Sequence, residues 1–417
     1  MAGHLKQQAS ERSNVSVMEG SMAIAQAVRA ARPGVIAAYP ITPQTHIVEF
    51  LADMVADGEL DAKYLLVESE FSAASVLFGA AATGVRSYTA SASQGLALMT
   101  EVVFNLAGVR LPVVLTGANR QLSAPIGLQP DHQDTMLLRD SGLIELYVES
   151  AQEAYDAHLQ AFKIAEDPAV RLPVIVCADG YILTHVFEPV RTLTQAQADA
   201  FLPPYRPPYL ITPDDPCVLG AYTDDATTLE VRYMAYQASL RAKGVIERVA
   251  GEYRDAFGLY HGGLIDAYRL EGAEVALIAM GSVVSTLREA VDRLRERGKR
   301  VGLLKIRSYR PFPTEALRVG LRGVKAVAVL DKGLSMGFGS ILTGDVKSAL
   351  YSTPGRPLVL GTMAGYGGRE VTLETVDEIV ALAERAIARG EVEDECVFMN
   401  LRRDILPEEE LAAEGVR

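Results

Sequence analysis

The stretch Gly34-Val35-Ile36-Ala37-Ala38-Tyr39-Pro40-Ile41-Thr42-Pro43 passes from an apolar segment of strand length directly into a polar turn between two prolines. Other short apolar runs end in a similar way at Glu70, at Ser93-Gln94 and at Asn119-Arg120. In an open parallel α/β sheet, ligands bind in the crevice at the carboxyl ends of the strands. These strand ends therefore predict one site that surrounds a small ligand with a hydroxyl, a carboxylate, an amide and a guanidinium.

Apolar runs of strand length alternate with segments of helical period from residue 19 to about residue 190. Such alternation indicates βαβ units and a parallel sheet, and right-handed crossovers bring the carboxyl ends of the strands to one edge. A second, smaller alternating unit follows from Ala273. We expect strands that end at Tyr39, Glu70, Ala92, Ala118, Val148, Ala178, Met280, Ile306, Leu330 and Met363, and helices over residues 20–32, 72–84, 94–107, 151–165 and 284–297.

Between the two units, repeated prolines over residues 203–216 exclude both a helix and a central strand. We expect an extended arm there, followed by a helix over residues 228–257. The sequence thus divides into an α/β domain over residues 1–190, a proline-rich arm with a helical linker over 191–257, and a smaller doubly wound α/β domain over 258–417.

The composition excludes several classes of protein. With 49% hydrophobic and 22% charged residues, the chain of 417 residues has the make-up of a soluble globular protein. No apolar stretch reaches the roughly 20 residues that cross a bilayer, and the polar N-terminus lacks the apolar segment of a signal peptide. The cytoplasm is therefore expected. A net charge of −13 argues against nucleic acid as a partner, since phosphate backbones require a basic surface.

The chain's own side chains are not expected to hold a metal. The 3 cysteines include no Cys-x-x-Cys pair, so neither a structural zinc site nor an iron–sulfur cluster can be built from them. The 6 histidines show no spacing typical of metal ligands, such as two on one helical turn. Any cluster that the function requires must therefore come from another chain.

Each strand-end side chain also has a purely structural interpretation. Glu70 suits a helix N-terminus, where negative charge is favourable, but the small residues after it predict close packing and burial, which favours a proton-donating carboxylic acid. Arg120 suits either an ordinary ion pair or, with its rigid fork of donors, a substrate carboxylate. Thr42 belongs either to a tight turn or to a binding site in which the prolines fix its hydroxyl. The polar segment 131–134 either caps a helix or contacts the site.

Several motifs, taken in order, resemble those of one protein family. They are Ala38-Tyr39-Pro40-Ile41-Thr42-Pro43, Glu68-Ser69-Glu70, Ser93-Gln94-Gly95-Leu96-Ala97-Leu98-Met99, Asn119-Arg120, Ser123-Ala124-Pro125, Asp131-His132-Gln133-Asp134, Arg139-Asp140-Ser141-Gly142 and Asp179-Gly180-Tyr181-Ile182-Leu183-Thr184-His185. The similarity continues through residues 307–313 and 364–369. Over nearly its whole length, the chain resembles the alpha subunits of multi-subunit pyruvate:ferredoxin oxidoreductases (pyruvate synthases), which belong to the 2-oxoacid:ferredoxin oxidoreductases.

The resemblance implies an enzyme that oxidatively decarboxylates a 2-oxoacid on thiamine diphosphate, passes electrons through iron–sulfur clusters to ferredoxin, and releases an acyl-CoA. It implies a domain that binds the cofactor's pyrimidine and a domain similar to the C-terminal domain of transketolase. By position, Glu70 corresponds to the glutamate that hydrogen-bonds the pyrimidine, while Thr42 and Arg120 match residues that bind the substrate near its carboxylate; these three are the expected catalytic residues. The residues that the resemblance assigns to the cofactor are Pro40, Ile41, Thr42, Glu70, Ser93 and Gln94, and those that it assigns to the substrate are Thr42, Asn119 and Arg120.

A missing motif predicts partner chains. The Gly-Asp-Gly stretch with a later Asn that holds magnesium diphosphate in this superfamily is absent, and Asp179-Gly180 and Gly344-Asp345 are incomplete versions of it. The resemblance therefore implies a beta subunit that carries the diphosphate site and a cluster, together with gamma and ferredoxin-like delta subunits. This chain would contribute half of a shared active site.

Two features depart from the family's pattern for pyruvate. Phe71 stands where histidine often follows the glutamate, and the loop Ile126-Gly127-Leu128-Gln129-Pro130 differs from the common form. Pyruvate and CoA are the expected substrates, with 2-oxoisovalerate, 2-oxoglutarate or oxalate as alternatives to pyruvate. A non-redox thiamine-dependent transferase or decarboxylase and a non-catalytic assembly subunit are further alternatives, although Thr42, Glu70 and Arg120 together argue against the latter.

Overall fold

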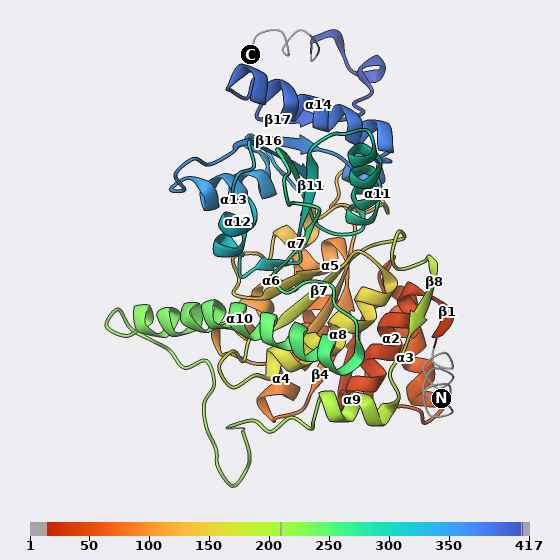
Figure 1. Cartoon of the computed structure of the whole chain (residues 1–417). Helices are drawn as coiled ribbons and strands as arrows, with labels where there is room; N and C mark the ends of the chain where they lie inside the picture. Colours follow the sequence, from red (N-terminus) through yellow and green to blue (C-terminus); the bar gives the residue numbers. More distant parts are fainter. Residues whose placement is uncertain (1–14, 209–210, 410, 412–417) are drawn as a thin grey trace, which may run out of the picture.

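The computed structural model of the chain describes residues 15–208, 211–409 and 411. These residues form two α/β units stacked one on the other, with a long helix and a projecting arm beside the first unit (Figure 1). Both units contain a mainly parallel sheet, so the predicted fold class is confirmed. Among the described residues, no helix combines the length and the apolar character that spanning a membrane requires. The expectation for the polar N-terminus concerns residues that mostly lie outside the described part.

A seven-stranded sheet forms the centre of the first unit, and its strands are parallel except for the edge strand β12. From one edge to the other its strands are β12 (Ser308–Arg310), β6 (Ile144–Tyr147), β7 (Val174–Asp179), β5 (Val114–Asn119), β4 (Ser87–Ser91), β2 (Val35–Ala38) and β3 (Lys63–Leu66). This order makes β5, β4, β2 and β3 neighbours. The strand ends that the sequence singles out therefore meet at one edge, as predicted.

Helices cover both faces of this sheet because side chains along each buried strand alternate in direction. Val114 belongs to the core under α2, α3 and α8, whereas Leu115 belongs to the core under α4 and α6. The helices of this unit are α2 (Gly20–Ala31), α3 (Thr45–Ala56), α4 (Glu70–Ala82), α5 (Ser93–Leu98), α6 (Thr100–Gly108), α7 (Gln133–Met136), α8 (Ala151–Glu166), α9 (Gln195–Phe201) and α10 (Thr228–Phe257).

Two boundaries near the predicted site differ from the sequence-based expectation. Strand β3 ends at Leu66, and Glu70 is the first residue of α4 rather than the last residue of a strand. The reason is the hydroxyl of Ser69, which accepts a hydrogen bond from the backbone N–H of Ser72 at 3.2 Å and so caps the helix two residues earlier than predicted. The helix predicted over 94–107 is divided at Met99 into α5 and α6.

The segment predicted as an extended arm contains unexpected regular structure at its start. Strand β8 (Phe187–Arg191) pairs antiparallel with β1 (Val15–Glu19), and α9 begins with a capping box formed by Thr194 and Gln197. Beyond Phe201, the described residues form neither helix nor strand until α10 begins. Helix α10 covers Thr228–Phe257, as predicted.

The second unit has a six-stranded sheet in which only the edge strand β9 is antiparallel. Its strands in spatial order are β17 (Cys396–Phe398), β16 (Leu358–Met363), β13 (Ala326–Asp331), β10 (Val275–Ala279), β11 (Val301–Ile306) and β9 (Ile265–Tyr268). Helices α11 (Val283–Glu296) and α14 (Leu373–Arg389) pack on one face. Helices α12 (Thr314–Gly320) and α13 (Ile341–Leu350) pack on the other face, whose core is continuous with that of the first unit.

Buried charges join the two units. Strand β12, which follows β11 directly in the chain, pairs with β6 of the first sheet and so crosses the predicted domain boundary. Glu153 on α8 accepts hydrogen bonds from Lys305 at 2.5 Å and from Arg307 at 3.2 Å, and all three side chains are fully buried. Burial alone would raise the pKa of the Glu153 carboxyl, but the charges of Lys305, His261 and Arg307 hold that pKa below its usual value.

We predict that Glu153→Gln strongly destabilises the fold, because it leaves the buried Arg307 without a counter-charge and leaves Lys305 with Glu149, at 3.3 Å, as its only remaining carboxylate partner among the described residues. Breaking one side of a buried ion pair typically costs about 3–5 kcal/mol. The matched control is Glu384→Gln, whose partner Lys299 is largely exposed, and for which a loss below about 1 kcal/mol is expected. Urea unfolding of the full chain measures both values, and equal losses in the two variants would contradict the prediction.

Candidate active site

The turn after β2 is held in place by Gln44, which is fully buried. The side-chain amide of Gln44 donates to the carbonyl of Tyr39 at 2.8 Å, and its backbone N–H donates to the carbonyl of Ile41 at 2.9 Å. Pro40 and Thr42 are exposed within this turn, whereas Ile41 is half-buried. The turn therefore presents the hydroxyl-bearing Thr42 at the surface of the edge where the strands end.

Arg120 brings three of the predicted strand ends together. Its guanidinium donates to the carbonyl of Thr42 at 2.8 Å, to the side-chain oxygen of Gln94 at 3.5 Å and to the carbonyl of Gly127 at 3.2 Å. The side chain is only 6% exposed. Because a guanidinium carries five N–H groups, these three contacts orient Arg120 and leave donors over for a ligand.

The buried side chain of Asp134 links the backbone at the end of β4 to the backbone at the end of β5. One of its carboxylate oxygens accepts hydrogen bonds from the backbone N–H groups of Ser93 at 2.9 Å and Arg120 at 3.0 Å, and the other accepts from the amide of Asn119 at 2.9 Å. Burial raises the pKa of the Asp134 carboxyl, and these hydrogen bonds act in the opposite direction. Sequence analysis left the role of segment 131–134 open between helix capping and contact with the site, and for Asp134 the structure shows contact with the site's backbone.

The remaining predicted residues take different positions at the edge. The hydroxyl of Ser93 donates to the carbonyl of Gln121 at 2.7 Å, and the amide of Gln94 donates to the hydroxyl of Ser123 at 2.6 Å, so both anchor the loop after β5. Asn119 is fully buried, and its amide nitrogen also donates to Thr135. The Asn119 side chain is therefore directed into the interior, where it stabilises the end of β5 through Asp134 and Thr135.

Glu70 lies against the backbone of Gly95 at the start of α5. A Cβ atom at Gly95 would lie 2.5 Å from Oε1 of Glu70 and 2.3 Å from the hydroxyl oxygen of Ser91, so no larger residue fits there without displacing them. The Glu70 side chain is only 6% exposed, as its surroundings of small residues predict. The hydroxyl of Ser91 is buried and has no hydrogen-bond partner among the described residues. A buried carboxylate and a free hydroxyl therefore face the same glycine.

The second unit contacts the loop that lies beside the carboxyl ends of the strands of the first sheet. The backbone N–H of Gly368 donates to the carbonyl of Pro130 at 2.9 Å, and so the glycine-rich turn after β16 holds the loop over residues 121–130. Within that loop, Ile126 is 75% exposed, and Leu128 is also exposed. Burial raises the pKa of the Asp131 carboxyl, at the end of the loop, to about 7. The loop forms a wall beside Arg120 with apolar side chains directed outward.

A buried polar cluster that the sequence analysis did not predict fixes the second unit on this edge. Asp179, at the end of β7, accepts hydrogen bonds from Lys332 at 2.8 Å and from both the backbone and the hydroxyl of Ser282, and it lies 3.0 Å from His132. Burial opposes ionisation of Asp179, but the charges of Lys332 and His132 hold the pKa of its carboxyl well below the usual value. Lys332 and Ser282 themselves follow β13 and β10, so the carboxyl ends of the two sheets face each other.

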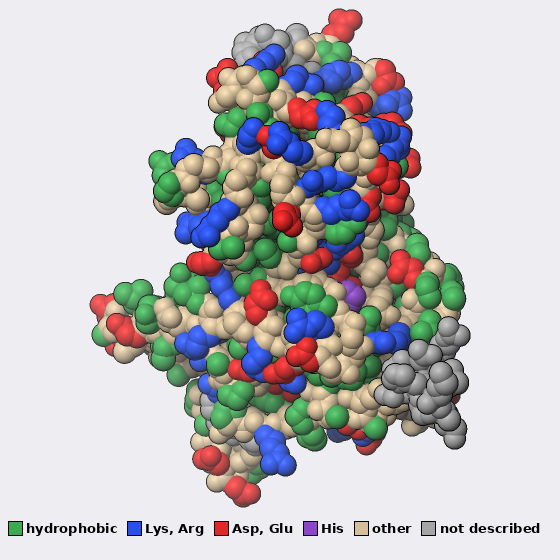
Figure 2. Space-filling view, viewed as in Figure 1, with side chains coloured by type: hydrophobic (Ala, Val, Ile, Leu, Met, Phe, Trp, Pro, Cys, Tyr) green, Lys and Arg blue, Asp and Glu red, His purple; other side chains and the backbone are tan. Residues whose placement is uncertain are grey.

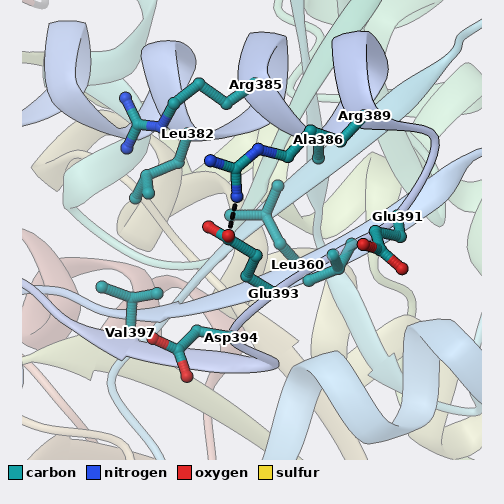
Figure 3. Close-up of a pocket in the computed structure, with 10 residues that line it drawn as sticks. Leu360, Leu382, Arg385, Ala386, Arg389, Glu391, Glu393, Asp394 and Val397 are labelled. Atoms are coloured by element: carbon teal, nitrogen blue, oxygen red, sulfur yellow. Dashed lines mark ion pairs between the residues drawn. The ribbon is translucent and has the colours of Figure 1, made fainter. Parts of the chain in front are cut away.

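A separate hollow lies between α14 and β17 and is lined by residues of the second unit alone (Figure 3). It is small, about 110 Å³, and Arg389 forms an ion pair with Glu393 across it. None of the residues expected to bind cofactor or substrate contributes to it. The strand ends of the first sheet therefore remain the candidate active site.

Comparison with known families identifies the family of the chain. Residues 26–251 match the family described as "Pyruvate flavodoxin/ferredoxin oxidoreductase, thiamine diP-bdg", and residues 273–376 match "Pyruvate:ferredoxin oxidoreductase core domain II". The chain belongs to the pyruvate:ferredoxin oxidoreductase family. The first match contains every predicted site residue, and the second covers most of the second sheet.

Individual relatives extend over nearly the whole chain. The pyruvate synthase subunit PorA of Methanosarcina barkeri is 46% identical over 95% of this chain and 98% of its own length. The ketoisovalerate oxidoreductase subunit VorA of Pyrococcus horikoshii is 40% identical over 93% of this chain and 98% of its own length. The family membership thus rests on full-length similarity to subunits of 2-oxoacid oxidoreductases.

Two solved structures share the fold. A 2-oxoglutarate:ferredoxin oxidoreductase from Magnetococcus marinus matches with a TM-score of 0.69 at 19% identity, over 90% of this chain and 65% of that one. A split-gene transketolase matches with a TM-score of 0.53 at 14% identity, over 89% of this chain and 99% of that one. The predicted similarity to thiamine diphosphate enzymes of the transketolase type is therefore confirmed at the level of the fold.

We predict that Gly95→Ala lowers the activity of the assembled enzyme about 100-fold, since a displacement of roughly 1 Å at a reacting centre has effects of this size. Alanine is favoured in a helix, so the loss would come from its contact with Glu70 and Ser91. The matched control is Gly79→Ala in the last turn of α4, where a Cβ meets nothing within 4 Å. This control should leave the activity unchanged. Steady-state assays of both complexes test the prediction, and full activity in Gly95→Ala would contradict it.

Proposed function

We propose that this chain is the alpha-type subunit of a pyruvate:ferredoxin oxidoreductase that acts together with partner subunits. The enzyme converts pyruvate and CoA to acetyl-CoA and carbon dioxide and passes two electrons to ferredoxin. The observation that carries this proposal is the set of side chains at the carboxyl edge of the first sheet, where Glu70, Arg120 and the Thr42 turn lie together. The full-length similarity to PorA subunits supports the same function.

The residues at the edge fit thiamine diphosphate. The side chain of Glu70 makes no hydrogen bond to another described residue, and its carboxylate packs closely on the backbone of Gly95. The buried hydroxyl of Ser91 likewise lacks a partner among the described residues. In this proposal Glu70 holds the pyrimidine, while Pro40, Ile41, Ser93 and Gln94 form the surrounding wall. When bound, the cofactor supplies the carbon nucleophile and the electron sink for decarboxylation.

The chain's own side chains bind, orient and hold protons. Glu70, which is only 6% exposed, directs its carboxyl group at a ring nitrogen of the cofactor, with which it can exchange a proton. The free donors of Arg120 pair with the carboxylate of the 2-oxoacid, for which the planar fork of a guanidinium is suited. Thr42 places its hydroxyl beside that carboxylate. Asn119 does not reach the ligand in this proposal; it positions the end of β5 through its hydrogen bond to Asp134.

Pyruvate is the proposed substrate because the PorA relatives are 42–47% identical to this chain, compared with 40% for the VorA relatives. The second candidate is 2-oxoisovalerate, which differs by a larger apolar group. The apolar side chains of Phe71, Ile126 and Leu128 lie on the segments that depart from the common pyruvate pattern, and all three are exposed. At these positions the enzyme would discriminate between substrates by the size of their side chains.

Partner subunits are proposed to complete the site. The edge strand β3 leaves Leu65 and Leu66 exposed a few residues before Glu70, with Leu66 at 71%. An uncovered apolar edge strand is a site for association. The N-terminal half of α10 projects from the body (Figure 1), and Figure 2 shows apolar side chains along it beside interspersed charges. Its large exposed apolar residues are Leu229, Val231, Tyr233, Met234 and Tyr236.

These surfaces suit a beta subunit that brings the magnesium diphosphate site and a cluster, with gamma and delta subunits and ferredoxin completing the electron path. In this proposal thiamine diphosphate is shared between subunits, and the iron–sulfur clusters lie on other chains only. The cytoplasm stays a prediction from the sequence.

We predict that Glu70→Gln abolishes turnover while the complex still assembles and binds the cofactor. The amide keeps the shape of the side chain but cannot give up a proton, and the loss of such a group typically lowers rates by about 10²–10⁴-fold. The matched control is Glu68→Gln, because Glu68 lies two residues earlier and is exposed. Pyruvate-dependent reduction of ferredoxin measures both. Activity like that of the wild type in Glu70→Gln would show that Glu70 has no catalytic role.

We also predict that the chain purified alone is colourless, inactive and unable to bind thiamine diphosphate tightly. The reason is that the diphosphate site and the clusters lie on the partners. Calorimetric titration with the cofactor and magnesium, together with the visible spectrum, tests this division. Adding the partner chains should restore both activity and tight binding, through an interface above the ~1,200–2,000 Å² of a standard complex. Micromolar binding by the solitary chain would contradict the prediction.

A further inference from the structure

Three potential metal ligands meet beside the Thr42 turn, although they are far apart in the sequence. Glu19 ends β1, His46 lies in the first turn of α3, and His185 lies in the loop after β7. One ligand atom from each side chain lies within 4.8 Å of the others. No metal site was expected from the sequence, because the histidines show no short ligand spacing and this set comes from three separate segments.

The hydrogen bonds at this cluster leave the appropriate atoms available. Nδ1 of His185 lies 2.7 Å from the hydroxyl of Thr184, and an imidazole that donates there presents its Nε2 lone pair on the opposite side. That hydroxyl is itself fixed, since it accepts a hydrogen bond from the backbone N–H of Tyr181 at 2.8 Å. Such a second hydrogen bond on a histidine is the usual companion of metal ligation.

The separations need only small adjustments to suit a metal ion. Oε1 of Glu19 lies 2.6 Å from Nδ1 of His46, and the rings of His46 and His185 are 4.6 Å apart between centroids. With bonds of about 2.0–2.2 Å to nitrogen and oxygen, an ion between these atoms would spread the first pair slightly and draw His185 inward. His46 is 43% exposed in its side chain, so water can fill a fourth position.

An ion pair between Glu19 and His46 explains their short contact but not the second imidazole beside them. The two imidazole rings are tilted by 34° rather than stacked face to face. Two imidazoles and a carboxylate form a ligand set that divalent transition metals prefer. We propose that Glu19, His46 and His185 bind one divalent transition-metal ion, with Zn²⁺ as the probe of choice.

The position of the site indicates what the ion would do. His46 belongs to the helix that follows the Thr42 turn directly, and the loop of His185 begins at Gly180, where a Cβ would lie 2.4 Å from the ring of Pro43. An ion here connects β1, α3 and the loop after β7. It would hold the turn that carries Thr42 from its outer side, without touching the substrate.

The test is titration of the full-length chain with Zn²⁺ by calorimetry and with Co²⁺ by visible spectroscopy. The wild type is expected to bind one ion, with the cobalt bands of nitrogen and oxygen ligands and a rise in the melting temperature that a chelator reverses. His46→Gln and His185→Gln are each expected to weaken binding by at least about 100-fold, since even outer-shell partners contribute 10–100-fold. The matched control is Glu49→Gln, an exposed carboxylate one turn further along α3, and it should bind like the wild type.

A second variant and a second preparation keep the test decisive. Glu19→Gln leaves both histidines in place and should weaken binding as well, and the assembled complex should lose one zinc per chain when it carries His185→Gln. Absence of saturable binding, equal affinity in all variants, or a thiolate-to-cobalt charge-transfer band from the cysteines would overturn the proposal.

Discussion

The candidate active site depends on the hydrogen bonds that the buried carboxylate of Asp134 accepts. At the ends of β4 and β5 the backbone leaves the hydrogen-bond ladder of the sheet, and the N–H groups of Ser93 and Arg120 need a new acceptor away from water. Asp134 accepts from both, and also from the side chain of Asn119. Because an unpaired polar group in the interior costs about 1–3 kcal/mol, the two loops are held where Gln94 and Arg120 can meet.

From that edge the geometry of the site follows step by step. Arg120, fixed at its backbone by Asp134, reaches the carbonyl of Thr42 and so links the end of β5 to the turn after β2. Glu70 lies in the first turn of α4, and the absence of a side chain at Gly95 leaves room for the Glu70 carboxylate. Each polar group is positioned by backbone or by buried partners, as preorganised sites require.

The second unit completes the edge through charges that are buried between the units. Asp179 with Lys332, and Glu153 with Lys305 and Arg307, join residues from both units. Buried pairs of this kind contribute little net stability but penalise any other arrangement heavily. They therefore set the orientation of the two units, and with it the contact between Gly368 and the loop beside Arg120. Strand β3 and the N-terminal half of α10 keep exposed apolar side chains outside these contacts.

The sequence alone determined the layout. Alternating apolar runs and helical periods predicted two mainly parallel sheets, and the polar residues after the strands of the first sheet predicted where a site would lie. These features are local, because strand alternation and helical period depend on neighbouring residues. Helix α10 was predicted with its observed bounds for the same reason. The capping effect of Ser69, which placed Glu70 on a helix, was also local but was missed in favour of a longer strand.

Only the tertiary structure decided which residues meet. Lys332 and the cluster of Glu19, His46 and His185 carry no spacing that marks them in the chain. The segment of Asp134 was singled out in the sequence, but its partners, which lie at the ends of other strands, were not. The contact of Gly95 with Glu70 likewise depends on how α4 and α5 pack. Such contacts arise from the order of strands and the docking of two sheets, which are properties of the whole chain and are not encoded in any short segment of it.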